Sequence, residues 1–334
     1  MLSVLLVAMA LSDSGPADLA AAAAASGRPP ECWPERRSEL GGETSVWARA
    51  RRPGLERYCA LLARSHARVV ESPTAARAAA LEALRLEPRR AAPHVVLGRV
   101  AVRLGQPGEA LREFDRAEAI DSRSVEQPAA LHDKATALRQ VGQLGRALEA
   151  YRLLVPRSGL VPSRSWRARV LLEAAHASMA VGGVGGVGAG AGGDKAPALD
   201  EALAYLREAG EDQHHELRLD TALSLVLVLD RAGRASQADA MLAEIGSSAA
   251  WADHPQPSYL ARPVDWLALQ ALALERSSPR AASALWKRFL EQDRGCPEAW
   301  KQAARARQER LERRAGARPL AERGPAPRKR KAPP

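Results

Sequence analysis

Two stretches of this sequence carry residue types that could bind phosphate or a metal ion. The segment Gly188–Lys195 (GAGAGGDK) has the glycines and the lysine of a phosphate-binding loop. However, Asp194 intervenes before Lys195, no Ser or Thr follows the lysine, and no strand precedes the loop to hold its amides in a cradle. The segment Glu211–Glu216 (EDQHHE) has carboxylates and imidazoles, but it lacks HExxH spacing and a CxxC partner. We therefore expect no metal and no cofactor at either segment.

Serine, histidine and aspartate are present but follow no catalytic spacing. The sequence contains no G-x-S-x-G motif and assembles no nucleophile, base and oxyanion donors. Four histidines, His66, His94, His132 and His176, fall at different phases of helical segments. We therefore expect no catalytic residue and no small-molecule substrate.

Positive charge is concentrated at the C-terminal end of the chain. The net charge is +10, and eleven basic residues against three acidic ones lie between Arg305 and Pro334. The run Arg328–Lys331 (RKRK) could contact nucleic acid or an anionic membrane. A solvated tail is the simpler interpretation, because no aromatic residues interleave with the basic ones. A cytosolic, nucleic-acid-associated protein that acts through this tail is the alternative function.

Three cysteines and an apolar N-terminus bear on the cellular compartment. Cys32, Cys59 and Cys296 form no CxxC pair, so zinc-ribbon and thioredoxin-type sites lack their ligands. Residues 2–11 (LSVLLVAMAL) are too few to span a bilayer but suit the core of a signal peptide, and no other segment approaches a membrane span. Export to the periplasm or beyond would permit a disulfide between Cys32 and Cys59, whereas a cytoplasmic protein would keep both reduced.

A repeated helical pattern dominates the middle of the chain. Its clearest unit begins at Ala91, with Leu97-Gly98 in a first helix and Ala110 and Phe114 in a second. This spacing resembles the tetratricopeptide repeat, in which L-G-x2-Y is followed by A-x3-F within 34 residues. The resemblance implies an all-α, right-handed superhelical solenoid of helix-turn-helix repeats.

Small residues at helix crossings and larger residues between them account for the pattern. Glycine and alanine let two helices approach closely, while leucine and the aromatic residues fill the gaps between helices. The positions expected to pack the repeats together are Leu97, Gly98, Ala110, Phe114, Ala117, Ala147, Tyr151, Ala202, Ala238, Trp266, Ala282 and Trp286.

The repeats set the expected domain boundaries. About six degenerate units cover residues 55–296, with a Gly-rich linker at 182–193 inside them. The remaining segments are expected to be a signal peptide or leader (1–26), an irregular lead-in (27–54), a terminal capping helix (297–314) and a disordered basic tail (315–334).

A partner-binding groove is implied by the family resemblance. Tetratricopeptide proteins usually bind their ligand along the concave face that the first helices form. The corresponding positions here are Arg68, Arg99, Arg103, His132, Arg139 and Arg231. Guanidinium groups favour a carboxylate-bearing peptide, although exposed arginines are also ordinary in a chain that lacks asparagine and has the composition of a GC-rich bacterial genome. The sequence thus predicts a non-catalytic scaffold in the cell envelope that binds another protein or an acidic peptide.

Overall fold

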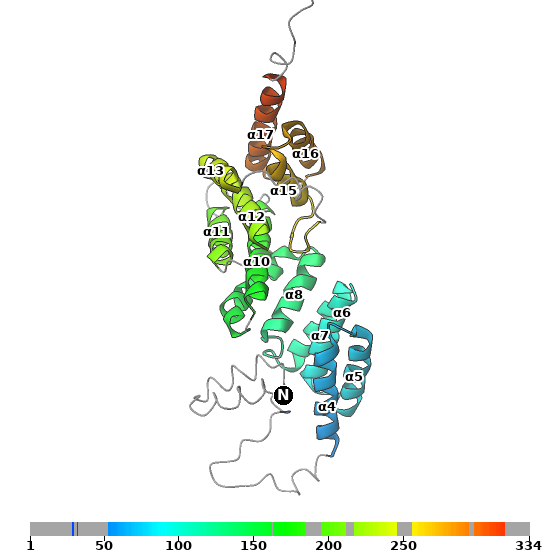
Figure 1. The fold of residues 1–334 in the computed structure, drawn as a ribbon. Coiled ribbons are helices and arrows are strands. Elements are labelled where there is room, and N and C mark those ends of the chain that lie inside the picture. Colours follow the sequence, from blue (N-terminus) through cyan, green and yellow to red (C-terminus); the bar gives the residue numbers. More distant parts are fainter. Residues whose placement is uncertain are drawn as a thin grey trace, which may run out of the picture. The chain divides into compact units, whose positions relative to one another are not determined.

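The fold is all-α, as the sequence predicts. In this computed structural model the described residues contain thirteen α-helices and no strand (Figure 1). The described residues are Pro29, Cys32 and the segments 53–161, 163–184, 195–211, 217–245, 256–293 and 297–317. The predicted leader, nearly all of the lead-in, Cys296 and the tail from residue 318 lie outside them.

The chain divides into two compact units, Met1–Val170 and Leu171–Pro334, which are here called unit 1 and unit 2. In unit 1, each helix packs on the next, and the alternate helices α4, α6 and α8 also contact one another in series. The helices of unit 1 are α4 (Pro53–Arg68), α5 (Pro73–Leu86), α6 (Ala91–Arg103), α7 (Pro107–Ile120), α8 (Pro128–Gln140) and α9 (Leu144–Leu154), followed by the 3-10 helix η2 (Val155–Leu160).

Unit 2 begins within α10 (Arg164–Val184), which crosses the boundary between the units. Its helices are α11 (Lys195–Glu211), α12 (Arg218–Arg231), α13 (Ala235–Ile245), α15 (Asp265–Leu274), α16 (Pro279–Gln292) and α17 (Glu298–Ala317). Helix α12 is central, because it packs on α11, α13, α15 and α17. The Ser178 hydroxyl on α10 donates a hydrogen bond of 2.7 Å to the Ala198 carbonyl on α11.

Three helix pairs share the same turn, and glycine makes it possible. Gly105, Gly142 and Gly233 follow the first helix of a pair and have φ of 70°, 77° and 74°, a region that disfavours side chains. At Gly105 the turn is a Schellman motif, in which Gly105 N–H donates to the Val102 carbonyl and the next N–H, of Gln106, donates to Ala101. Proline at the start of the second helix, as in α7, fits because the first N–H groups of a helix have no partner within it.

In the pair α6–α7, the helices approach each other where Gly98 faces the ring of Phe114. Gly98 lies seven residues before the turn glycine, and Phe114 lies nine residues after it. In the other two pairs, these positions are Ala135 with Tyr151 and Val226 with Leu242. All of these positions are buried. A Cβ atom built on Gly98 would meet the Phe114 ring at 2.8 Å, so this crossing has no room for a side chain. From pair to pair, a larger residue on the first helix is thus accompanied by a smaller residue on the second helix.

The positions that were expected to pack the repeats lie in the cores of the two units. Leu97, Gly98 and the small and aromatic residues of the second helices are buried, and Trp266 is partly buried against the core of unit 2. Helix α10 continues to Val184, so its last residues lie within the range 182–193 that was expected for a glycine-rich linker. Residues 185–194 lie outside the described residues.

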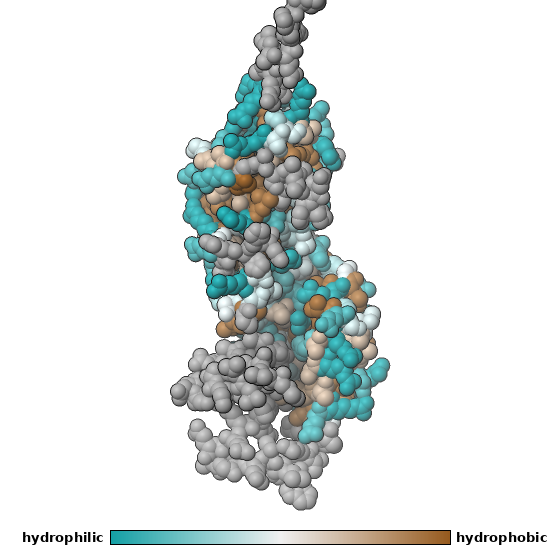
Figure 2. All heavy atoms as spheres, in the orientation of Figure 1, coloured by the Kyte–Doolittle hydropathy of each residue, from teal (hydrophilic) through white to brown (hydrophobic). Residues whose placement is uncertain are grey.

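Helix α17 covers the end of unit 2 with one face. Its buried residues Trp300, Ala304, Arg307 and Leu311 recur at intervals of three and four, the period of one helical face. The opposite face is hydrophilic and exposed (Figure 2). Helix α17 spans Glu298–Ala317, in the region where the sequence predicts a capping helix at 297–314, and it buries Arg307.

Candidate functional site

The first helices of unit 1 are joined by a chain of polar contacts centred on Arg99 of α6. Its Nε donates to Asp133 Oδ2 on α8 at 2.9 Å, and its guanidinium also lies 3.2 Å from Nδ1 of His66 on α4. Arg103, one turn later, donates to the other oxygen of Asp133 at 2.8 Å. Asp133 is 1% exposed, so both arginines neutralise a buried carboxylate. These contacts hold α4, α6 and α8 side by side as one surface, which is here called the first-helix wall.

His66 is neutral in this arrangement. Burial, followed by the positive charge of Arg99, lowers its pKa from 6.5 to about 4. Since arginine can only donate, Nδ1 of His66 accepts from Arg99, which requires the neutral ring. The histidine therefore lies beside a cation without repelling it.

The other residues predicted for the groove lie in different environments. Arg68 is exposed at the end of α4, and Arg139 on α8 is nearly buried. His132 packs edge-on against Trp166, with ring centroids 5.6 Å apart. Five of the six predicted groove residues belong to unit 1, and among them Arg99 and Arg103 converge on one carboxylate.

Arg231, the sixth predicted groove residue, lies inside unit 2. Its guanidinium donates two hydrogen bonds to Asp265, at 3.0 and 2.6 Å, and stacks over the Trp300 ring at 4.2 Å. Burial raises the pKa of Asp265, but the charge and hydrogen bonds of Arg231 outweigh it and hold that pKa below its ordinary value. Because this guanidinium is occupied within the protein, we leave Arg231 out of the proposed partner surface.

The two arginine–aspartate links share a spacing that sequence reasoning overlooked. Arg99 and Asp133 are 34 residues apart, and so are Arg231 and Asp265. This separation equals one tetratricopeptide repeat length, and each link joins the first helices of successive pairs. The sequence does contain a signal for these links, namely an arginine that is followed by an aspartate one repeat length later. It would have indicated that these arginines bind within the protein.

A second buried cation was also missed. Arg307 of α17 is 2% exposed and forms ion pairs with Asp230 at 3.0 Å, Glu275 at 3.0 Å and Asp239 at 3.2 Å. The Trp286 indole donates a further hydrogen bond of 3.0 Å to Glu275. Burial raises the pKa of Glu275, partly offset by Arg307. The cluster anchors α17 to α12, α13 and α15 through charge.

A serine and a histidine lie within hydrogen-bond distance in unit 2, yet they cannot act on a substrate. His176 Nε2 lies 2.9 Å from Ser224 Oγ, and the Tyr259 ring lies 5.0 Å from the imidazole. Tyr259 donates to Asp220 at 3.0 Å, and burial followed by the charge of Asp220 raises the pKa of its phenol. Ser224 is 0% exposed, so no carbonyl could reach it. This cluster contributes to the packing of α10 and α12.

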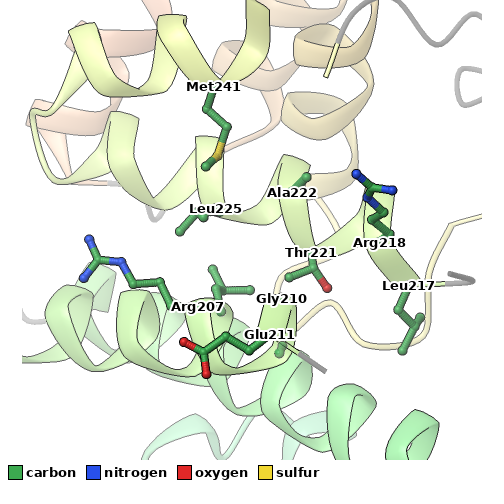
Figure 3. A pocket seen from close by; sticks show the side chains of 11 residues that line it. Arg207, Gly210, Glu211, Leu217, Arg218, Thr221, Ala222, Leu225 and Met241 are labelled. Carbon is green, nitrogen blue, oxygen red and sulfur yellow. The ribbon is translucent and has the colours of Figure 1, made fainter. Parts of the chain in front are cut away.

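A pocket of about 530 Å³ opens between α11, α12 and α13 of unit 2 (Figure 3). Glu211, the first residue of the segment with metal-capable side chains, lies on its edge, while 212–216 are outside the described residues. In the part of the chain that the structure describes, no three His, Cys, Asp or Glu residues could hold a metal ion together. None of the described helices combines the length and the apolar character needed to cross a membrane.

Cys32 and Cys59 are joined by a disulfide, with their Cα atoms 5.5 Å apart. Both cysteines pack against the core that includes Tyr58 and Leu62 of α4. The bond therefore ties a residue of the predicted lead-in to the first helix pair.

Comparison with known proteins finds similarity among solved structures only, and that similarity is distant. No protein-family model matches the chain, and no curated protein matches it. Among solved structures, that of PilF from Pseudomonas aeruginosa, from a study titled as its functional characterisation, aligns with a TM-score of 0.43 at 17% identity. The alignment covers 76% of this chain and 99% of the PilF chain.

Proposed function

We propose that this protein is a non-catalytic helical-repeat scaffold that binds another protein through the first-helix wall of unit 1. The observation that carries the proposal is the continuous contact of α4, α6 and α8, which presents three helices as one surface. Repeat proteins of this architecture use such extended surfaces for binding, because each repeat adds to the same face.

The chemistry of the wall favours an acidic partner. Arg68 is exposed, and the side chain of Arg103 is 37% exposed while it bonds to Asp133. Two arginines share that one carboxylate, so the group carries a net positive charge. A carboxylate of a partner could accept the remaining N–H donors of Arg103.

The disulfide between Cys32 and Cys59 supports a location in the oxidising part of a cell envelope. The apolar run at residues 2–11 supports the same location. Thiol titration of the protein isolated without reductant tests this point. One reactive thiol, from Cys296, is expected under denaturing conditions, and three would contradict it.

Charge reversal tests the wall directly. The full chain would be immobilised, a partner captured from envelope extract of the host would be purified, and its affinity measured by calorimetry. Arg68→Glu should weaken binding by about tenfold, because attraction becomes repulsion. Arg112→Glu, the same change at an exposed position of the second helix α7, is the matched control and should leave affinity unchanged.

The alternative function is tested with the same proteins. Binding of a 30-base-pair DNA duplex would be measured at two salt concentrations, with the full chain and with residues 318–334 deleted. Salt-sensitive binding that depends on the deleted residues, together with no effect of Arg68→Glu on protein capture, would favour nucleic-acid association instead.

A further inference from the structure

The pocket in unit 2 could accept one large side chain of another molecule. It lies where the last turns of α11 and the first turns of α12 diverge, with α13 covering one side (Figure 3). Its lining is mainly apolar and comes from three helices. The apolar lining residues are Leu206, Ala209, Leu217, Ala222, Leu225 and Met241. An apolar group entering this space would be removed from water on several sides at once.

Two arginines on opposite sides of the pocket give it a charge. Arg207 comes from α11 and Arg218 from the first turn of α12, and Figure 3 shows them on either side of the apolar residues. Both are exposed, and neither forms an ion pair with another residue that the structure describes. This differs from Arg99 and Arg103 of the first-helix wall, which both pair with Asp133. Glu211 is the only acidic residue among those that line the pocket.

We propose that this pocket binds a peptide segment of a partner protein, in which a large apolar side chain is flanked by carboxylates. The apolar side chain fills the space between α11, α12 and α13, and the carboxylates pair with Arg207 and Arg218. Buried apolar anchors with charged groups around them are typical of protein-binding sites.

The polar groups of the pocket favour a peptide over a small metabolite. Metabolite sites place polar groups inside the cavity, where they fix the orientation of the ligand. Here the charged groups stand in solvent at the edge, and Thr221 is the one hydroxyl in the lining, with its Oγ1 buried and inaccessible. A peptide can use edge charges because its neighbouring residues extend beyond the pocket. The pocket belongs to unit 2 and the first-helix wall to unit 1, so this proposal does not depend on the proposed function.

The structure offers a substitution that fills the pocket without disturbing the core. Gly210 lines the pocket in the last turn of α11, and a Cβ atom added there would meet nothing within 4 Å. Gly210→Leu should therefore occupy the space while favouring the helix. Gly145→Leu in α9 is the matched control, since Gly145 is also helical and a Cβ atom there would meet nothing within 4 Å.

The test uses a phage-displayed library of random twelve-residue peptides, selected on the immobilised full chain. The selected peptides should contain a large apolar residue with Asp or Glu nearby. Synthetic copies should bind Gly210→Leu about tenfold or more weakly by fluorescence anisotropy, and should bind Gly145→Leu as they bind the native chain. Circular dichroism and thermal unfolding would show that the Gly210→Leu chain is folded.

Charge variants sharpen the result. Arg207→Glu and Arg218→Glu should each weaken binding several-fold, and Glu211→Gln should strengthen it, because a negative charge that repels the carboxylates of the peptide is removed from the lining. Arg68→Glu, in the first-helix wall, should have no effect on these peptides. Failure of this proposal would thus be distinguishable from failure of the proposed function.

Several results would overturn the proposal. These are the absence of any enriched peptide, enrichment of basic or uncharged peptides, and equal binding of the selected peptides to the Gly210→Leu chain. Self-association of the native chain that Gly210→Leu abolishes would assign the pocket to a second copy. Saturable binding of dodecanoate, sensitive to Gly210→Leu, without any peptide binding would assign it to small amphiphiles.

Discussion

Both units join successive first helices through arginine–aspartate pairs, but the two units bury these pairs to different depths. Arg103 and Arg231 both stand two residues before the glycine of the turn, and each bonds to an aspartate of a neighbouring first helix. In unit 1 the arginine is 37% exposed, and its aspartate 1%. In unit 2 the two side chains are 3% and 2% exposed. An arginine two residues before the turn glycine can therefore be partly exposed, as in unit 1, or buried, as in unit 2.

The coverage by α17 explains the burial in unit 2. Trp300 of that helix stacks on the guanidinium of Arg231, and Arg307 enters the adjacent acidic cluster. A buried arginine must be matched by carboxylates, since an uncompensated charge away from water costs several kcal/mol. The link is therefore structural in unit 2, whereas in unit 1 its exposed arginine can also meet a partner.

Arg231→Ala should have the largest effect on stability. It would leave Asp265 buried without its partner, which should lower the free energy of unfolding by about 3–5 kcal/mol in urea denaturation. The double variant Arg231→Met with Asp265→Leu removes both charges and should recover most of the loss. A loss below about 1 kcal/mol in Arg231→Ala would mean that this link does not support unit 2.

The pH dependence of stability should reveal His66 in unit 1. Its pKa is lowered from 6.5 to about 4, so the unfolded chain binds the proton more readily than the folded one. The associated stability is complete above pH 6.5 and is lost as the pH falls towards 4, on the order of 3 kcal/mol.

His66→Gln should flatten this part of the profile measured by thermal unfolding. Asp265 in unit 2 should lose its contribution in a lower range of pH. Its pKa is lowered, so its contribution is present above the unfolded value near 4 and is lost only below that pH. An unchanged slope between pH 6.5 and 4 in His66→Gln would contradict the assignment of His66.

Gly98→Ala should destabilise unit 1 by about 1–2 kcal/mol, because the new methyl group meets the Phe114 ring at 2.8 Å. Gly54→Ala in α4 is the control, since a Cβ atom there has no neighbour within 4 Å. The control should be neutral or slightly stabilising. Chemical denaturation of both variants compares them, and equal midpoints would show that the α6–α7 crossing is looser than described.

Arg103→Ala should have the smallest effect, below about 1 kcal/mol, because the side chain is partly exposed and Arg99 still neutralises Asp133. The comparison with Arg231→Ala by the same denaturation measurement is the direct test of burial. Equal losses in the two variants would show that exposure does not separate the links.

Much of the fold could be predicted because the repeat signal is local. The turn glycines and the small and aromatic residues at the crossings, such as Gly98 with Phe114, act between helices that are adjacent in the chain. The site was less predictable. A map of first-helix positions grouped Arg231 with Arg99 and Arg103, although only the packing of α17 shows that Arg231 is enclosed.

The sequence by itself determined an all-helical chain, the pairing of its helices, and the residues at which they cross. Those features depend on periodicity and on side-chain volume within one repeat length. The tertiary structure alone decided which arginines form ion pairs with Asp133 and Asp265. It also decided how Arg307 anchors α17 and that Arg207 and Arg218 lie beside an apolar pocket. Burial and charge pairing depend on helices about a repeat or more apart, and no local pattern encodes the depth at which a side chain finally lies.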